Sequence, residues 1–261
     1  MSADTNKKNF CPPIKGLIET SFLDWDGHMC ATLFLGGCNF RCPFCHNYEL
    51  VLDPNSLSTW PIDAVLSQLR RLRPWVEALC ISGGEPTCYE DLAQLITIFK
   101  QEGLNIKLDT NGYRPWILEK LLNQCIIDYV AMDVKTIIDA EAYSICTGRE
   151  IDIKRIEASI DLLKKSNIEH EFRLTALPRL HPPNIIMEWA KTLSGDNSKL
   201  RLQRFSPSRT LDPQFGHEIP YEETEFDKLV AQVKEIEQHN LQLPTAANKG
   251  MRENPLPTIP R

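Results

Sequence analysis

The sequence predicts an α/β fold, a partial (β/α)6 barrel of the TIM type that stays open on one side. Strand-like and helix-like segments alternate six times, which is typical of a parallel sheet with right-handed crossovers. Six units are fewer than the eight that close a full barrel. The 261 residues also suit one barrel-type domain better than two large domains. A flat, doubly wound sheet is the alternative architecture.

The expected strands are short runs of apolar and β-branched residues. They span residues 30–35, 76–82, 105–110, 129–133, 170–176 and 199–205. The expected helices span residues 62–72, 90–102, 115–123, 154–166, 183–193 and 222–239. In the fourth helix, Ile156, Ile160 and Leu163 recur at helical spacing, which predicts one apolar face toward the sheet.

Both ends of the chain are expected to lie outside the folded core. Composition predicts an N-terminal tail over 1–15 and a Pro-rich tail over 244–261, which leaves a core domain over 16–243. The first residues lack the apolar stretch of a secretory signal. No apolar run approaches the ~18 residues of a membrane-spanning helix. We therefore expect a cytoplasmic protein that does not enter a membrane.

Charge and composition exclude several classes of protein. Hydrophobic residues make up 42% and charged residues 25% of the chain, as in globular proteins, which excludes a disordered or fibrous chain. The net charge is −6, from 29 Lys and Arg against 35 Asp and Glu. Such an acidic chain is poorly suited to gripping phosphates, so no nucleic-acid partner is expected.

Polar residues follow each expected strand at the same end. They are residues 36–47, residues 83–87, residues 109–112, Asp133 with Lys135, Arg173 with Thr175, and Gln203 with Arg204. Active sites of parallel α/β folds lie at these carboxyl ends. Taken singly, Gly83 and Gly84 fit a turn, and Asp133 with Lys135 fits a surface pair. Their recurrence in phase predicts a functional site.

Cysteine provides the strongest local pattern. The odd count of nine argues against a disulfide framework. Cys38, Cys42 and Cys45 share one glycine-led loop, and three thiolates so placed can hold zinc or an iron–sulfur cluster. Three ligands to four irons leave one iron open to a small molecule. A zinc loop completed by a distant residue, or three incidental thiols, is the alternative.

The other six cysteines are expected to have other roles. Cys30, Cys80 and Cys125 sit in or beside apolar runs, where a thiol behaves as a small hydrophobe. Cys11 falls in the expected tail. Cys88 follows the Gly83–Gly84 turn and Cys146 is expected in a loop, so both lie nearer the site.

The string of motifs resembles a known family. GGCNFRCPFCHN, with its three cysteines, resembles the signature of the radical S-adenosylmethionine (radical SAM) superfamily. Together with SGGEPT, DTNG, AMDVK and EFRLT in this order, it resembles the glycyl-radical-enzyme activating proteins, over residues 16–215. Within them, the branch that activates anaerobic ribonucleoside-triphosphate reductase is most similar.

This resemblance implies a radical SAM core with a [4Fe-4S] cluster held by Cys38, Cys42 and Cys45 as metal ligands and catalytic residues. The open iron would chelate the amine and carboxylate of the methionine part of SAM. Phe44 would pack on adenine, with loop packing as the alternative. The glycines Gly83 and Gly84 would meet the SAM amino group.

The remaining implied contacts come from four strands. Glu85 would accept from the SAM amino group, and Lys135 and Arg173 would contact SAM, Arg173 at its carboxylate. Asp109, Thr110 and Asp133 resemble a set that holds a monovalent cation in some activases.

One implied contact concerns the substrate rather than SAM. Asp26 resembles a residue that touches the substrate glycine loop, although a β-turn explains the segment equally well. The sequence departs from the family here, with His28 and Met29 where many activases have Pro-Gly.

The expected function is therefore enzymatic. A flavodoxin or ferredoxin would reduce the cluster, SAM would be cleaved, and a glycyl radical would form on a partner enzyme, anaerobic ribonucleotide reductase. One alternative is a radical SAM enzyme with a small-molecule substrate, similar to 7-carboxy-7-deazaguanine synthase. Another is a non-catalytic iron–sulfur or zinc binding module.

Overall fold

The computed structural model describes residues 12–195 and 197–241. The predicted C-terminal tail, Cys11 and most of the predicted N-terminal tail lie outside these residues. Within them, no helix is long and apolar enough to cross a membrane.

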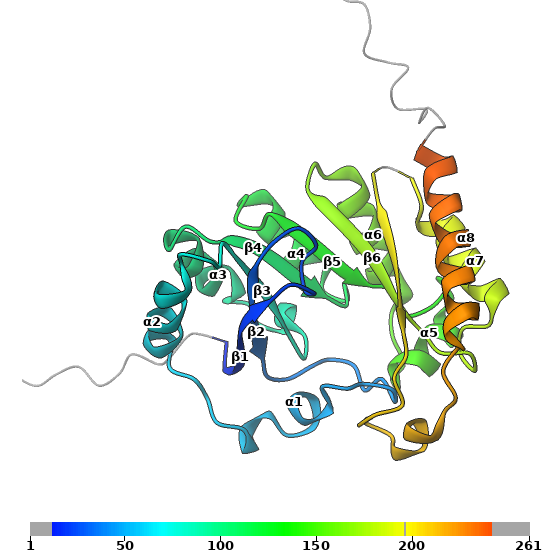
Figure 1. Ribbon diagram of the computed structural model, residues 1–261, viewed down its shortest axis with the longest axis horizontal. Helices are drawn as coiled ribbons and strands as arrows, with labels where there is room; N and C mark the ends of the chain where they lie inside the picture. The colour runs from blue at the N-terminus through cyan, green and yellow to red at the C-terminus, as the bar shows by residue number, and fades with distance from the viewer. Residues whose placement is uncertain (1–11, 196, 242–261) are drawn as a thin grey trace, which may run out of the picture.

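One seven-stranded sheet forms the centre of the molecule, with its strands in sequence order (Figure 1). The strands are β1 (Ile14–Ser21), β2 (Cys30–Leu35), β3 (Ala78–Gly83), β4 (Asn105–Thr110), β5 (Tyr129–Asp133), β6 (Glu169–Ala176) and β7 (Lys199–Arg204). β1 is antiparallel to β2, and β2 to β7 are all parallel. A doubly wound sheet reverses its strand order, so the unreversed order supports the open partial barrel.

The helices that follow the parallel strands occur where the sequence predicts them. They are α2 (Ile62–Leu72), α3 (Leu92–Gln101), α4 (Pro115–Asn123), α6 (Ile153–Lys165), α7 (Pro183–Leu193) and α8 (Glu223–Leu241). Each lies within two residues of its predicted bounds. Two short helices, α1 (Tyr48–Leu52) and α5 (Ala140–Thr147), and strand β1 are additional.

Helix α5 places Cys146 in a helix, whereas the sequence predicted a loop there. Its start is capped by Asp139, whose side chain accepts a hydrogen bond from the Ala142 N–H. It ends at Gly148 in the left-handed conformation, with φ +64°. The eight residues between show no clear apolar stripe, so periodicity could not reveal the helix.

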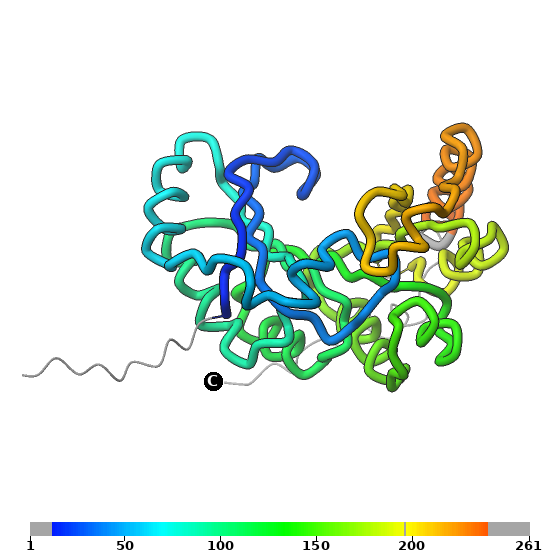
Figure 2. The backbone as a smooth tube through the Cα atoms, turned by 90° about the horizontal axis from the view of Figure 1, so that it is seen from below, coloured from blue at the N-terminus to red at the C-terminus, as the bar shows by residue number. Residues whose placement is uncertain are grey.

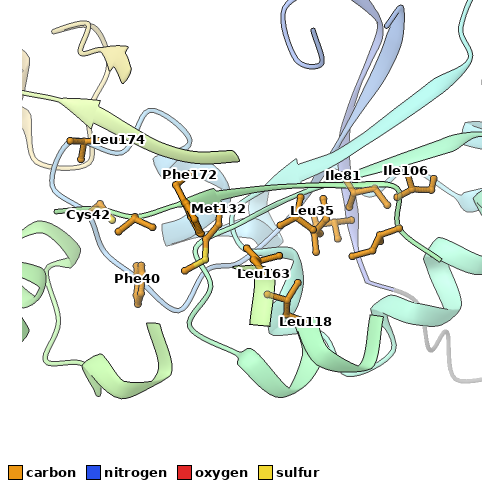
Figure 3. Packing of buried hydrophobic residues seen from close by; sticks show 14 of the residues in the cluster. Leu35, Phe40, Cys42, Ile81, Ile106, Leu118, Met132, Leu163, Phe172 and Leu174 are labelled. Atoms are coloured by element: carbon orange, nitrogen blue, oxygen red, sulfur yellow. The ribbon is translucent and has the colours of Figure 1, made fainter. Parts of the chain in front are cut away.

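The outer face of the sheet carries the main hydrophobic core. Leu35, Ile81 and Met132 from the strands pack in one cluster with Leu118 of α4 and Leu163 of α6 (Figure 3). Apolar burial at roughly 25 cal/mol per Å² makes this layer the principal stabilising element.

The inner face of the sheet is different, because its strands carry small residues there. Cys30, Ala78, Cys80 and Ala131 form a separate cluster with Trp25 and Tyr129. Trp25 comes from the tip of the β1–β2 hairpin, and its ring lies 5.5 Å from that of Tyr129. The small side chains leave room for this indole, so the hairpin tip fills part of the barrel interior.

Buried His181 ties three segments together at the carboxyl ends of β5 and β6. Its Nδ1 accepts from the Leu177 N–H at 3.2 Å, and its Nε2 donates to the Lys135 carbonyl at 2.8 Å. Its own carbonyl accepts from the Tyr221 hydroxyl at 2.6 Å. Burial lowers the pKa of His181 to about 4.

We predict that His181 makes stability fall with pH below neutrality. Its folded pKa lies below the unfolded value near 6.5, so stability is complete above pH 6.5 and is lost as pH falls toward 4. Between pH 7.5 and 5 the loss should be about 2 kcal/mol. Urea unfolding of the wild type and of His181→Gln at several pH values measures this change in the free energy of unfolding. Equal pH slopes for the two proteins would contradict this assignment.

Candidate functional site

A cavity of 470 Å³ opens at the carboxyl ends of the parallel strands. We call it the first cavity. All but one of the site residues predicted from the sequence line it: Cys38, Cys42, Phe44, Cys45, Gly83, Gly84, Glu85, Asp109, Thr110, Asp133, Lys135 and Arg173. Asp26 does not line this cavity. The sequence thus located one contiguous site from residues that are far apart along the chain.

The loop with the three cysteines is held by hydrogen bonds among its own residues. The Cys45 N–H donates to the Cys42 carbonyl at 3.0 Å, and the Phe40 N–H approaches the Cys38 sulfur at 3.3 Å. The Arg41 guanidinium donates to the carbonyls of Cys38 and Phe40 at 2.8 and 2.7 Å. This fixes the direction in which the loop presents its thiols.

Burial raises the pKa of all three motif thiols, that of Cys42 to about 11. These thiols therefore become thiolates when a cation compensates the charge, as a metal centre does. In the described part of the chain, no three His, Cys, Asp or Glu side chains are grouped to hold a metal ion. A four-iron cluster is larger than a single metal ion, and each cysteine binds a different iron, so its ligands need not converge on one point.

A second observation supports an anionic group beside Cys38. The Nδ2 group of Asn39 is buried without an acceptor in the described residues. The Asn39 Oδ1 is already taken, since it accepts from Asn111 Nδ2 at 2.9 Å. An iron–sulfur cluster would offer acceptor sulfurs there, so the donor set fits this cofactor.

The two glycines after β3 are required by close packing. A Cβ on Gly84 would lie 1.9 Å from the Gly37 carbonyl oxygen, and Gly83 has φ +122°. The Gly83 carbonyl accepts from Asn47 Nδ2 at 3.0 Å. The cysteine loop and the β3 loop therefore touch directly, and a side chain at either glycine would separate them.

Glu85 is fully engaged by the protein itself. Its Oε1 accepts from the Thr87 N–H, the Thr87 hydroxyl and the Thr110 hydroxyl, at 3.0, 2.5 and 2.7 Å. Its Oε2 accepts from the Asn111 N–H at 2.6 Å. Burial still raises the pKa of this carboxyl above its usual value. Glu85 thus joins the β3 and β4 loops, in addition to lining the first cavity.

Alternating charges form a continuous row on the inner face of β4, β5 and β6. Lys107 pairs with Asp109 at 2.9 Å, and Arg173 pairs with Asp109 at 3.2 Å and with Asp133 at 2.8 Å. Lys135 completes the row at 3.0 Å from Asp133. We call these five residues the charge row. Three cations against two anions give it a net charge of +1.

The ion pairs of the charge row shift the pKa values of its members. Burial opposes ionisation of Asp133, but Arg173 and Lys135 outweigh it and lower its pKa to about 2. Arg173 and Lys107 hold the pKa of Asp109 below its usual value, and Asp133 holds the pKa of Lys135 above its usual value, despite burial in both cases. The row therefore stays charged at neutral pH.

Sequence reasoning missed three polar residues of the site. Lys107 is 2% exposed and faces the interior because it lies two residues before Asp109 in the same strand, a signal that strand alternation offers. Asn39 and Asn111 meet across two loops, and no local pattern predicts that contact.

Asp26, the predicted substrate contact, lies at the hairpin tip and pairs with Arg201 of β7. It lines a second cavity of 720 Å³, which shares the lining residues Asp24 and Gln203 with the first cavity. The structure thus places the predicted substrate residue outside the lining of the first cavity.

Comparison with known proteins assigns the fold and the cysteine loop to one family. Residues 32–185 match the family model of the radical SAM superfamily. A protein of Methanocaldococcus jannaschii assigned as a glycyl-radical enzyme activating enzyme is 34% identical over 77% of this chain and 83% of its own length. The chain therefore belongs to the radical SAM superfamily and is an enzyme of that class, a family that implies a [4Fe-4S] cluster and SAM.

Two further proteins show the range of relatives. A protein of Pyrococcus horikoshii assigned as a GTP 3′,8-cyclase is 23% identical over 77% of this chain and 65% of its own length. The crystal structure of Streptococcus suis SuiB, bound to its precursor peptide SuiA, is similar with a TM-score of 0.60 at 16% identity. That match covers 78% of this chain and 44% of SuiB, and it shows the fold alone.

We predict that Glu85→Gln destabilises the folded protein by about 1–3 kcal/mol, because an amide NH₂ would face the Asn111 N–H in a buried position. Chemical denaturation measures the free energy of unfolding. Glu119→Gln, at an exposed position of α4, is the matched control and should be neutral. Equal stability of the two variants would mean that the buried hydrogen bonds contribute nothing.

We also predict that Cys38→Ala, Cys42→Ala or Cys45→Ala each abolishes iron retention. Cys30→Ala and Cys80→Ala, on the inner face away from the loop, should keep the iron and lose at most ~1–2 kcal/mol of stability. Iron content after anaerobic reconstitution measures both. Iron loss from Cys80→Ala equal to that from Cys42→Ala would refute the three-ligand assignment.

Proposed function

We propose that this enzyme is a glycyl-radical-enzyme activase and that its protein substrate is an anaerobic ribonucleotide reductase. Two findings together support the proposal. The first cavity is lined by all the residues predicted to hold the cluster and SAM, and the chain is 34% identical to the M. jannaschii activating enzyme over most of both chains. The peptide complex of SuiB supports a macromolecular substrate for this fold.

In this proposal Cys38, Cys42 and Cys45 hold the cluster, and SAM lies in the first cavity. When bound and reduced, this cluster would supply the one electron that breaks the S–C5′ bond of SAM; the products would be methionine and, after transfer of a hydrogen atom from a glycine Cα of the partner, 5′-deoxyadenosine and a glycyl radical. A flavodoxin or ferredoxin would supply the electron.

The chain's own residues bind and orient SAM. Arg173 and Lys135 of the charge row line the first cavity and are the cations that can pair with the SAM carboxylate there. Phe44 is 5% exposed and offers an apolar ring for adenine. The Gly83 carbonyl keeps one lone pair beyond its bond to Asn47, so it can accept from the SAM ammonium.

A monovalent cation remains a prediction. Its expected ligands already have protein partners, because Asp109 pairs with Lys107 and Arg173, Asp133 with Arg173 and Lys135, and Thr110 donates to Glu85. The test is SAM cleavage in potassium and in tetramethylammonium buffers. Equal rates in the two buffers would exclude a required small cation.

The second candidate is a radical SAM enzyme for a small nucleotide. The similarity to the P. horikoshii protein favours it, at lower identity and coverage than the activase relative. A nucleotide substrate would itself be consumed and would produce no protein radical.

Electron paramagnetic resonance distinguishes the two candidates. The reconstituted enzyme is mixed with SAM, reductant and an anaerobic ribonucleotide reductase from the same genome. The proposal predicts a glycyl radical doublet on the reductase, absent with Cys42→Ala. A reaction that cleaves SAM, leaves the reductase without a radical and consumes GTP would contradict it.

A further inference from the structure

Two segments from elsewhere in the chain contact the loop that carries the three cysteines. The Arg41 N–H of this loop donates to the Thr147 carbonyl of α5 at 2.8 Å, and Figure 2 shows α5 (green) beside the loop (blue). The ring of Phe40 lies 5.4 Å from the ring of Tyr113, which stands just before α4. The end of α5 and the start of α4 therefore lie next to the cysteine loop.

The two segments also contact each other and form one surface. The Asp152 N–H, just before α6, donates to the Tyr113 hydroxyl at 3.1 Å. We call residues 113–120 and 148–155 the loop-side surface. None of these described residues lines the first cavity, so a protein bound to them would leave the SAM site open.

The loop-side surface exposes an indole beside two guanidinium groups. Trp116 is 44% exposed, and Arg155 and Arg114 lie 5.3 and 5.9 Å from the centre of its ring. The two arginines have acidic neighbours, Asp152 and Glu90, each at 3.6 Å. Trp and Arg are the side chains that most often dominate the binding energy of protein interfaces. An exposed indole with two adjacent cations therefore marks a surface for a protein partner.

Packed side chains lead from this indole to the cysteines. Arg155 contacts the ring of Tyr113 at 5.0 Å as well as that of Trp116, and Tyr113 contacts Phe40. Phe40 is 2% exposed and lines the first cavity, and its N–H approaches the Cys38 sulfur at 3.3 Å. Electron transfer between proteins proceeds through packed atoms and weakens steeply with distance. The loop-side surface therefore offers a continuous route to a cluster held by Cys38.

Charge distinguishes this region from the chain as a whole. Residues 36–47 and the loop-side surface together contain six Arg and Lys against three Asp and Glu. Glu90, which pairs with Arg114, raises the number of acidic residues to four, so the region carries two positive charges in excess. The whole chain has a net charge of −6. An acidic protein is therefore repelled by most of the chain and attracted to this region.

We propose that the loop-side surface is the docking site of the electron donor and that this donor is an acidic flavoprotein of the flavodoxin type. A flavin at the surface of its carrier presents the edge of an aromatic ring system, which the indole of Trp116 can contact. Carboxylates around that flavin pair with Arg114 and Arg155. One electron leaves the reduced flavin and enters the cluster, and no bond is made or broken. This inference rests on the cluster of the proposed function and adds the kind of reductant and its place on the surface.

The first test measures docking without turnover. Oxidised flavodoxin from the same genome is titrated into the reconstituted holoenzyme in a calorimeter. Trp116→Ala should raise the Kd about tenfold and Arg155→Gln about fivefold, as the loss of an interface indole and of a charge pair implies. Trp116→Phe keeps an aromatic ring and should restore most of the affinity. Trp75→Ala, an exposed tryptophan at the amino end of β3, is the matched control and should bind as the wild type does.

The second test separates docking from damage to the cluster. In stopped-flow mixing at low donor concentration, reduced flavodoxin should reduce the cluster of Trp116→Ala about tenfold more slowly than that of the wild type. Dithionite is a small reductant that needs no docking site, and it should reduce both clusters at the same rate.

Three results would overturn the inference. They are equal Kd values and rates for the wild type, Trp116→Ala and Arg155→Gln; an equal slowing of reduction by dithionite; and dependence on Trp116 with a ferredoxin but not with flavodoxin. The proposed function is tested separately, because dithionite replaces the donor in the radical experiment. A glycyl radical formed with dithionite by Trp116→Ala supports the activase function even if the docking site is wrong.

Discussion

The charge row on β4, β5 and β6 is the constraint on which the rest of the site depends. Burying one unpaired charge costs several kcal/mol, so each member is tolerated only because its neighbour is present. The ion pairs link strands β4, β5 and β6 at their carboxyl ends. They replace the aliphatic layers that fill a closed barrel, and so keep a polar interior where a charged ligand can bind.

The two faces of the sheet have different functions. The outer face buries Leu35, Ile81 and Met132 against helices and stabilises the fold. The inner face is lined by small residues near the hairpin and by charges near the carboxyl ends, so it cannot collapse into a second apolar core. Space therefore remains inside the barrel, and Trp25 fills only part of it. The two connected cavities are the consequence.

Much of this arrangement could be predicted from the sequence. Apolar runs typical of strands alternate along the sequence with segments of helical periodicity, which predicts the six parallel strands. The polar residues that follow these strands line one cavity. The exceptions have physical causes. Strand β1 is a half-exposed edge strand with Gly16 and Lys15, so its pattern is weak. The second cavity depends on where the hairpin tip packs, and Arg201 is 175 positions from its partner Asp26.

Two residues of the site have roles that the motifs did not indicate. The SGGEPT motif predicts ligand binding, yet the Glu85 carboxylate accepts four hydrogen bonds from Thr87, Thr110 and Asn111 of the protein itself. Lys107 showed no motif, yet it neutralises Asp109 from within the protein. Local motifs identify which loops form a site, whereas hydrogen-bond partners across loops are decided by packing.

The central claim is that three thiolates hold a cluster whose fourth iron binds SAM in the first cavity. Electron–nuclear double resonance on the reduced holoenzyme tests it most directly, with SAM carrying ¹⁵N in its amino group and ¹⁷O in its carboxylate. The account predicts hyperfine coupling of both nuclei to the cluster, lost when Cys42 is replaced by alanine. A reduced cluster that shows neither coupling in the presence of saturating SAM would contradict it.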